Sequence, residues 1–212
     1  MSGTSAPATA HGPHHAGPYN PAKGRLGMWL FICTEVLLFG GLFLLYAVYR
    51  YRYAEAFHAA SGLLDRLFGT ANTIVLITSS LTVVLAIFEF ERGKPTRARN
   101  YLLFTLLCGL AFLVIKSFEW GAKFEHGLYP NAPHLMSMGF GEILYFGLYF
   151  TMTGLHAIHV IVGMSVLFVA WRRIGKGTLM RTRPAFLENG GLFWHLVDVI
   201  WIFLFPLFYL IS

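Results

Sequence analysis

Five long stretches of the sequence are almost wholly apolar, and most charged residues lie between them. The stretches cover residues 26–49, 72–90, 100–117, 140–171 and 187–211. A helix of about 20 apolar residues crosses the ~30 Å hydrocarbon core of a bilayer. The pattern therefore predicts an all-α, polytopic membrane protein, a bundle of five transmembrane helices. The fourth helix is long enough to tilt or to project beyond the bilayer.

Composition agrees with this prediction. Of 212 residues, 56% are hydrophobic and 12% are charged, which is more apolar surface than a soluble domain keeps away from water. The formal net charge of +6 would point to nucleic acid in a soluble protein. In a membrane protein the placement of the charges is more informative than their sum, and we expect no nucleic-acid partner.

The Lys and Arg residues predict an orientation. Eleven of the sixteen precede the first stretch, or separate the second from the third or the fourth from the fifth. The side of the membrane with more Lys and Arg is usually cytoplasmic. Because five crossings put the two ends of the chain on opposite sides, we expect a cytoplasmic N-terminus and a periplasmic C-terminus.

The start of the chain has a different composition. Residues 1–24 are rich in Ala, Gly, Pro, Ser and Thr, which predicts a mobile cytoplasmic tail. Residues 25–212 then form a single five-helix domain. We expect no cleavable signal peptide, because the first apolar stretch is late and long. A solvated tail is the favoured interpretation of His11, His14 and His15; metal binding and proton relay are the alternatives.

Polar residues form a regular stripe on each of the last two predicted helices. On the fourth helix the spacing alternates between three and four residues, which places the stripe on one face. Because ionisable groups avoid lipid, both stripes should face protein, and we expect His156 or His159 to hydrogen-bond to the fifth helix. The fourth helix carries Glu142, Tyr145, Tyr149, Met152, His156, His159 and Gly163, and the fifth carries Glu188, Gly191, His195 and Asp198.

A metal or haem site is the functional alternative for His156, His159 and His195. Two histidines three residues apart can share a metal, but no matching pair occurs on a facing helix. Structural hydrogen bonding is therefore the favoured interpretation, with no cofactor on this chain. Cys33 and Cys108 lack CxxC spacing and are interpreted as small packing residues.

Glu35 lies well inside the first apolar stretch. The favoured interpretation is a protonated glutamic acid that hydrogen-bonds to a neighbouring helix. A proton-handling role is the alternative, but a relay needs successive stations along a path. One intramembrane glutamate does not provide such a path.

Two further polar sets lie in the second and third predicted helices. Lys116 and Glu119 are three residues apart near the end of the third helix, where they can neutralise each other. Asn72, Ser79 and Thr82 on the second helix are predicted to hydrogen-bond between helices.

Five segments, in order, resemble one known family. The run FWHLVDVIWIFLF at 193–205 is similar to its Trp-His-Phe-Val-Asp-Val-Val-Trp pattern, and TGLHAIHVIVG at 153–163 to its Thr-Gly-Phe-His-Gly-Leu-His-Val pattern. TEV at 34–36 and ANTIVLITSS at 71–80 resemble its Ser-Glu-Val and Asn-Thr…Ser-Ser segments. Glu119 fits the acidic residue that closes the next helix. The chain thus resembles subunit III of haem-copper terminal oxidases, most of all cytochrome c oxidase, in a five-span bacterial form.

The resemblance implies a non-catalytic core subunit of a proton-pumping complex in the bacterial inner membrane. Such a complex reduces oxygen to water with electrons from cytochrome c. Subunit III of this family packs on subunit I, shares the complex with subunit II and cytochrome c, binds phospholipid and supports proton uptake. Haems and copper are expected on the partner subunits, and no catalytic centre is expected on this chain.

The resemblance also implies a set of site residues. Glu35, His156 and His195 are candidates for the lipid or proton environment. The family-motif or buried polar positions are Glu35, Asn72, Glu119, His156, His159, Glu188, Trp194, His195 and Asp198.

The chain departs from many members of the family, which have seven spans and a lipid cleft between the first two and the other five.

Other functions stay open on the sequence alone. One is the equivalent subunit of a quinol oxidase or nitric oxide reductase. Others are a b-type haem carrier and a proton-coupled transporter. Membership of a larger respiratory supercomplex is also open.

Overall fold

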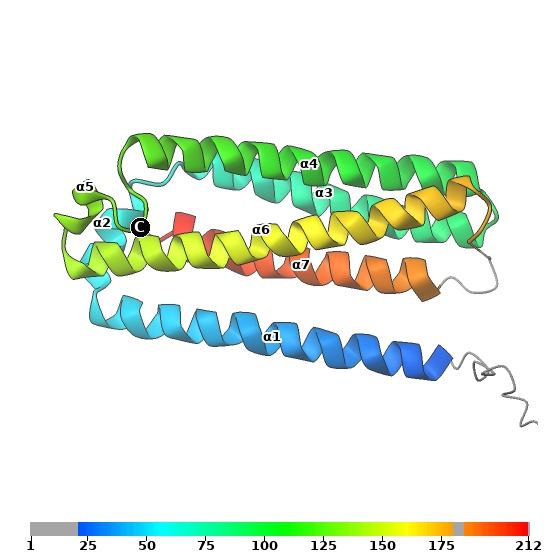
Figure 1. Cartoon of the computed structure of the whole chain (residues 1–212), viewed down its shortest axis with the longest axis horizontal. Coiled ribbons are helices and arrows are strands. Elements are labelled where there is room, and N and C mark those ends of the chain that lie inside the picture. Colours follow the sequence, from blue (N-terminus) through cyan, green and yellow to red (C-terminus); the bar gives the residue numbers. More distant parts are fainter. Residues whose placement is uncertain (1–20, 180–184, 212) are drawn as a thin grey trace, which may run out of the picture.

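The computed structural model describes residues 21–179 and 185–211, and within them it has seven helices and no strand. Five helices are long and apolar enough to cross a membrane, which confirms the predicted fold class and number of spans (Figure 1). The helices are α1 (Pro21–Arg52), α2 (Ala54–Ser61), α3 (Arg66–Glu91), α4 (Pro95–Glu125), α5 (Pro133–Met136), α6 (Phe140–Gly175) and α7 (Ala185–Tyr209).

The long helices extend past the apolar stretches that predicted them. The third span was predicted over 100–117, whereas α4 has 31 residues, and α3 begins at Arg66 rather than near residue 72. At that start the Asp65 carboxylate accepts a hydrogen bond from the Leu67 N–H at 2.8 Å, a typical N-cap. Apolar composition marks only the part of a helix inside the hydrocarbon, so capping residues set the true ends.

The short connection between α3 and α4 follows from two residues. Gly93 has φ +78°, a left-handed conformation that glycine adopts without a steric penalty and that commonly ends a helix. Pro95 then opens α4 at its first turn, where a missing N–H costs nothing. The two helices therefore form a tight antiparallel hairpin.

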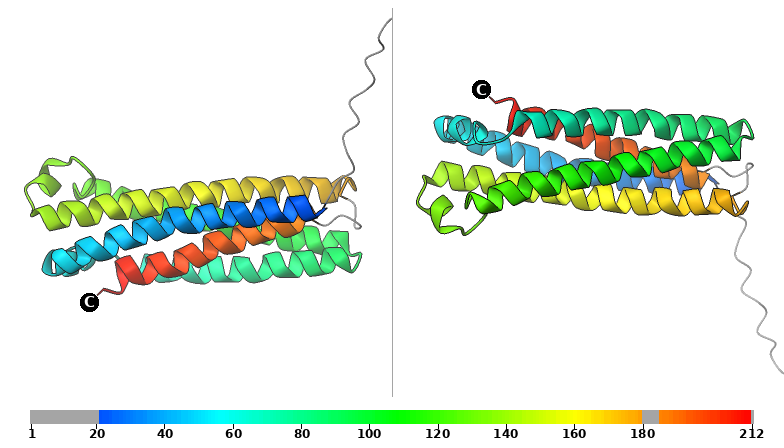
Figure 2. Two further views of the ribbon diagram at one scale, coloured as in Figure 1. Left: turned by 90° about the horizontal axis from the view of Figure 1, so that it is seen from below. Right: turned by 90° about the horizontal axis from the view of Figure 1, so that it is seen from above.

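Helices α3, α4, α6 and α7 form a four-helix bundle, and α1 lies outside it against α6 and α7 (Figures 1 and 2). In α1 only 6% of the most apolar window is buried within the chain, compared with 50% in α7. The C-terminal helix is thus the most buried of the five spans. The N-terminal end of α1 and the C-terminus lie at opposite ends of the molecule (Figure 1), as five crossings require.

The polar stripe of the fourth predicted helix does face the protein. Tyr145, Tyr149, Met152 and His156 of α6 are fully buried. The opposite side of the same helix is apolar and exposed, with Ile158 at 58% and Ile161 at 51%. The face prediction is therefore confirmed for this helix.

Hydroxyl groups from other helices hold the last turn of α7 and the residues just after it. The final carbonyls of a helix have no partner inside the helix. The hydroxyls of Tyr46, Tyr145 and Ser61 donate to the carbonyls of residues 207, 208 and 211, at 2.5, 2.8 and 2.6 Å. Helices α1, α2 and α6 therefore converge on the C-terminal end of α7.

Candidate functional site

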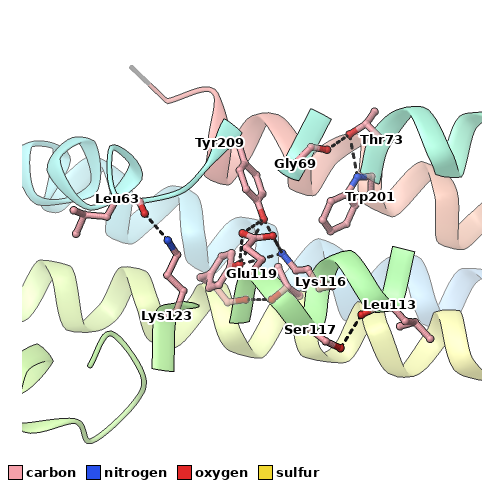
Figure 3. A network of polar contacts seen from close by, with 12 residues as sticks. Leu63, Gly69, Thr73, Leu113, Lys116, Ser117, Glu119, Lys123, Trp201 and Tyr209 are labelled. Atoms are coloured by element: carbon pink, nitrogen blue, oxygen red, sulfur yellow. Dashed lines mark hydrogen bonds and ion pairs between the residues drawn. The ribbon is translucent and has the colours of Figure 1, made fainter. Parts of the chain in front are cut away.

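The most extensive buried polar network contains Lys116, Glu119, Tyr149 and Tyr209, which we call the Lys116 cluster. Figure 3 shows Lys116 and Glu119 of α4 facing Tyr209 of α7. The Lys116 Nζ lies 3.1 Å from Glu119 Oε2, 3.0 Å from the Tyr149 hydroxyl and 2.6 Å from the Tyr209 hydroxyl. The two hydroxyls donate to Glu119 Oε1 at 2.7 and 2.6 Å. One network thus joins α4, α6 and α7.

The charges of this cluster are balanced and desolvated. The side chains of Lys116 and Glu119 are only 3% and 1% exposed, so each would be costly to bury alone. Together they form a neutral pair, and the tyrosine hydroxyls use the remaining hydrogen-bonding capacity. The predicted neutralisation of Lys116 by Glu119 is therefore confirmed. The cluster holds α4, α6 and α7 together.

The sequence did not identify the tyrosines as part of this network. Tyr149 was assigned to the inward stripe, which gave its face but not its partner. Tyr209 is 93 residues from Lys116, and a tyrosine near the end of a span is usually an interfacial anchor. The sequence nevertheless contained one indication. A buried lysine ammonium has three N–H donors that need acceptors, and Glu119 alone does not supply three.

Glu35 of α1 contacts His159 of α6. Glu35 Oε2 lies 2.8 Å from His159 Nε2, and His159 Nδ1 lies 2.7 Å from the Leu155 carbonyl oxygen. A carbonyl only accepts, so Nδ1 carries a proton, and a single proton is shared between Nε2 and the carboxyl group. The pair is neutral overall whichever of the two atoms holds that proton. The predicted bond from Glu35 to a neighbouring helix is confirmed, whereas the prediction of a fifth-helix partner for His159 is wrong.

The motif residues of α7 pair mainly with α3. Trp194 Nε1 donates to the Ser79 hydroxyl at 2.9 Å, and the Ser80 hydroxyl lies 2.6 Å from His195 Nδ1. Consecutive residues of a helix point about 100° apart, so the two contacts lie on different sides of the α3–α7 junction: Trp194 is buried, whereas His195 is partly exposed. Periodicity predicted an inward polar stripe on α7, but His195 of this stripe is partly exposed, and periodicity did not indicate that α3 would supply the hydrogen-bonding partners. Ser79 and Thr82 make the predicted interhelical bonds, the latter to Thr105 at 2.8 Å.

Trp194 also occupies a slot made by two glycines. A Cβ at Gly109 of α4 would lie 2.9 Å from the Trp194 ring, and a Cβ at Gly163 of α6 would lie 3.0 Å from it. Small residues let membrane helices approach closely. The ring therefore packs between α4 and α6, while its N–H reaches α3.

Three of the predicted polar residues are poorly supplied with hydrogen-bond partners. Asn72, His156 and Asp198 are buried, and within the described residues none of their side-chain polar atoms has a partner at full hydrogen-bonding geometry, although the Ser80 hydroxyl lies near the Asp198 carboxyl group. His156 packs instead against the rings of Phe112 and Trp201, at centroid distances of 5.5 and 5.2 Å. The interhelical bond predicted for Asn72 is wrong, as is a fifth-helix hydrogen-bond partner for His156.

The remaining predicted residues are dispersed. Glu142 lies in the first turn of α6 at one end of the bundle and Glu188 in the first turn of α7 at the other, and both are partly exposed. Both cysteines are free thiols. His11, His14 and His15 lie outside the described residues.

Residues 21–179 and 185–211 contain no set of side chains that could hold a metal ion. Nowhere in these ranges do three His, Cys, Asp or Glu side chains converge. His159 contacts Glu35, His195 contacts Ser80, and His156 packs among aromatic rings. The expectation that this chain carries no cofactor stays a prediction.

The sequence of this chain is similar to those of known proteins. The family model described as cytochrome c oxidase subunit III matches residues 4–212. A heme-copper oxidase subunit I+III of Aeropyrum pernix is 32% identical over 92% of this chain, which spans 23% of that relative's length. The cytochrome c oxidase subunit 3 of Alkalihalophilus pseudofirmus is 31% identical, and the cytochrome bo(3) ubiquinol oxidase subunit 3 of Pseudomonas putida is 28% identical. The former alignment covers 88% of this chain and 86% of the relative, and the latter 88% and 85%. Because the family match includes all five spans, the chain belongs to the cytochrome c oxidase subunit III family of haem-copper oxidases.

Proposed function

We propose that this chain is a non-catalytic core subunit of a proton-pumping terminal oxidase that reduces oxygen to water. The family match over residues 4–212 carries this proposal. Haems and copper then reside on partner subunits. The Lys116 cluster, the Glu35–His159 pair and the Trp194–Ser79 hydrogen bond fit such a role, because each joins different helices.

Direct packing on subunit I is part of the proposal. The Aeropyrum pernix relative is named as subunit I+III, and this chain matches 23% of its length. A single chain that contains both parts keeps them at high effective concentration. We infer the same contact with subunit I for the present protein. Subunit II and cytochrome c belong to the same complex.

Lipid binding is supported by a groove between α4 and α6. The groove has a volume of about 410 Å³ and is lined by Leu, Ile, Met and Phe side chains, with Ser165 the one hydroxyl. Such a surface suits an acyl chain. The neutral Glu35–His159 pair is a candidate for control of the proton or lipid environment near α1.

Cytochrome c is the proposed electron donor, and the proposed location is a bacterial inner membrane with the N-terminus cytoplasmic. Ubiquinol is the second candidate donor, because one relative is a ubiquinol oxidase subunit. Donor sites lie on other subunits, so residues of this chain do not distinguish the two.

Purification through a tag on this chain, in mild detergent, tests the proposal. We expect co-purification of a large haem-bearing subunit, seen by mass spectrometry and by a reduced-minus-oxidised spectrum. A dicopper subunit in the same preparation identifies cytochrome c as donor, and its replacement by a copper-free homologue identifies quinol. A chain recovered alone and colourless contradicts the oxidase proposal and favours a transporter. A chain recovered alone with a haem band favours a haem carrier.

A further inference from the structure

Helices α3 and α7 run side by side (Figure 2), and a partly exposed polar pair lies where they meet. His195 and Ser80 are both partly exposed, and the Ser80 hydroxyl lies 2.6 Å from His195 Nδ1. Exposed apolar side chains flank the pair along both helices. We call this surface the α3–α7 face; its residues are Ile77, Ser80, Val84, Leu192, His195 and Ile202.

The pair lies deep in the span. With a rise of 1.5 Å per residue, Ser80 and His195 are each about 15 Å or more from either end of their helix. His195 Nε2 makes no hydrogen bond within the described residues. A partly exposed imidazole at this depth would face hydrocarbon chains, which offer no hydrogen-bond partner, so ionisable side chains in spans usually face protein.

The groove between α4 and α6 differs from the α3–α7 face in its polar atoms. Its lining is apolar except for Ser165, whose hydroxyl donates to the Ile161 carbonyl at 2.8 Å within the same helix. This hydroxyl is therefore satisfied without any partner outside the chain. Lipid chains can cover the α4–α6 surface at no polar cost, whereas the α3–α7 face keeps an unused polar atom.

We propose that the α3–α7 face docks on subunit I, which supplies a hydrogen-bonding group to His195 Nε2 at mid-membrane depth. The proposal rests on the proposed function, because it takes subunit I as the partner. Transmembrane interfaces are held by close packing and interhelical hydrogen bonds. Exposed Ile77 and Val84 supply the packing on either side of the polar pair.

Photo-crosslinking in the intact complex tests the location. The photoreactive residue p-benzoylphenylalanine replaces Ile77 on this face or Ile161 on the α4–α6 groove; the two are 53% and 51% exposed. We expect position 77 to give an adduct with subunit I, identified by mass spectrometry, and position 161 to give lipid adducts. Lipid adducts from 77, or subunit I adducts from 161, would overturn the proposal.

Substitution tests the energetics. Ile77→Trp overpacks the proposed interface, and Ile161→Trp is the matched control. Overpacking costs about 1–3 kcal/mol, so we expect Ile77→Trp to lower haem recovered per mole of tagged chain at least about fivefold and Ile161→Trp to leave it unchanged. His195→Phe keeps the ring and removes its hydrogen bonds, and it should lower recovery in the same direction. Equal recovery from all variants would refute the proposal.

The two proposals fail in different ways. If the wild-type chain brings down no haem-bearing subunit, the proposed function fails. If the wild type brings down that subunit and the two tryptophan variants behave alike, only the assignment of the face fails. A chain that misfolds is recognised because it leaves the monodisperse peak in size-exclusion chromatography, and crosslinking at position 77 then decides.

Discussion

Lys116→Met removes the cation of the Lys116 cluster and keeps most of the side chain's apolar volume. Removing one partner of a buried ion pair costs about 3–5 kcal/mol, because the other charge is left uncompensated. Glu119 is only 1% exposed, so water does not replace the lost partner. The hydroxyls of Tyr149 and Tyr209 still donate to its Oε1 at 2.7 and 2.6 Å. We therefore expect the lower end of that range, about 3 kcal/mol.

The assay is equilibrium unfolding in mixed micelles, with an ionic detergent as denaturant and tryptophan fluorescence as the signal. Lys94→Met is the matched control, because Lys94 is 46% exposed and lies 3.8 Å from Glu89; a surface pair contributes about 0–1 kcal/mol. Adding Glu119→Gln to Lys116→Met should recover at least about half of the loss, since the amide oxygen still accepts from both tyrosines without a buried charge. Equal losses for Lys116→Met and Lys94→Met would refute the reasoning.

Three further predictions concern packing and hydrogen bonds. Gly109→Val should destabilise the chain by about 1–3 kcal/mol, because its Cβ would meet the Trp194 ring; Gly121→Ala, with open space around the Cβ, should not destabilise it, and thermal unfolding in detergent compares the two. Ser79→Ala should cost about 1–3 kcal/mol by leaving the Trp194 N–H unpaired, and adding Trp194→Phe should show non-additivity in a double-mutant cycle. Glu35→Gln keeps an amide that donates to the imidazole on α6, so chemical-denaturant curves should shift less than for Glu35→Leu, by about 1 kcal/mol.

Local spacing allowed part of this structure to be predicted. Five apolar stretches predicted five spans, and three-residue spacing paired Lys116 with Glu119. The inward face of α6 followed from the alternation of three and four residues. Each of these features depends only on the geometry of one helix, so the sequence contains all the information needed.

Features that depend on which helices are neighbours were not predictable. His159 was expected to contact the fifth helix and instead meets Glu35 on the first. Periodicity defines the direction of a side chain from its own axis, but not the helix placed in that direction. Lys116 and Tyr209 lie 93 residues apart in the sequence, and only the assembly of the bundle brings their side chains together.

The exposed position of α1 bears on how the chain is made and handled. Four helices wrap one another, while α1 buries little of its apolar window and is joined to the bundle by contacts such as the Glu35–His159 and Tyr46–Leu207 hydrogen bonds. Because α1 precedes α6 and α7 in the chain, it leaves the ribosome before them and waits in lipid until they provide its docking sites. During that interval the bilayer, rather than the protein, is its main environment. Amide hydrogen exchange should accordingly find α1 the least protected of the five spans.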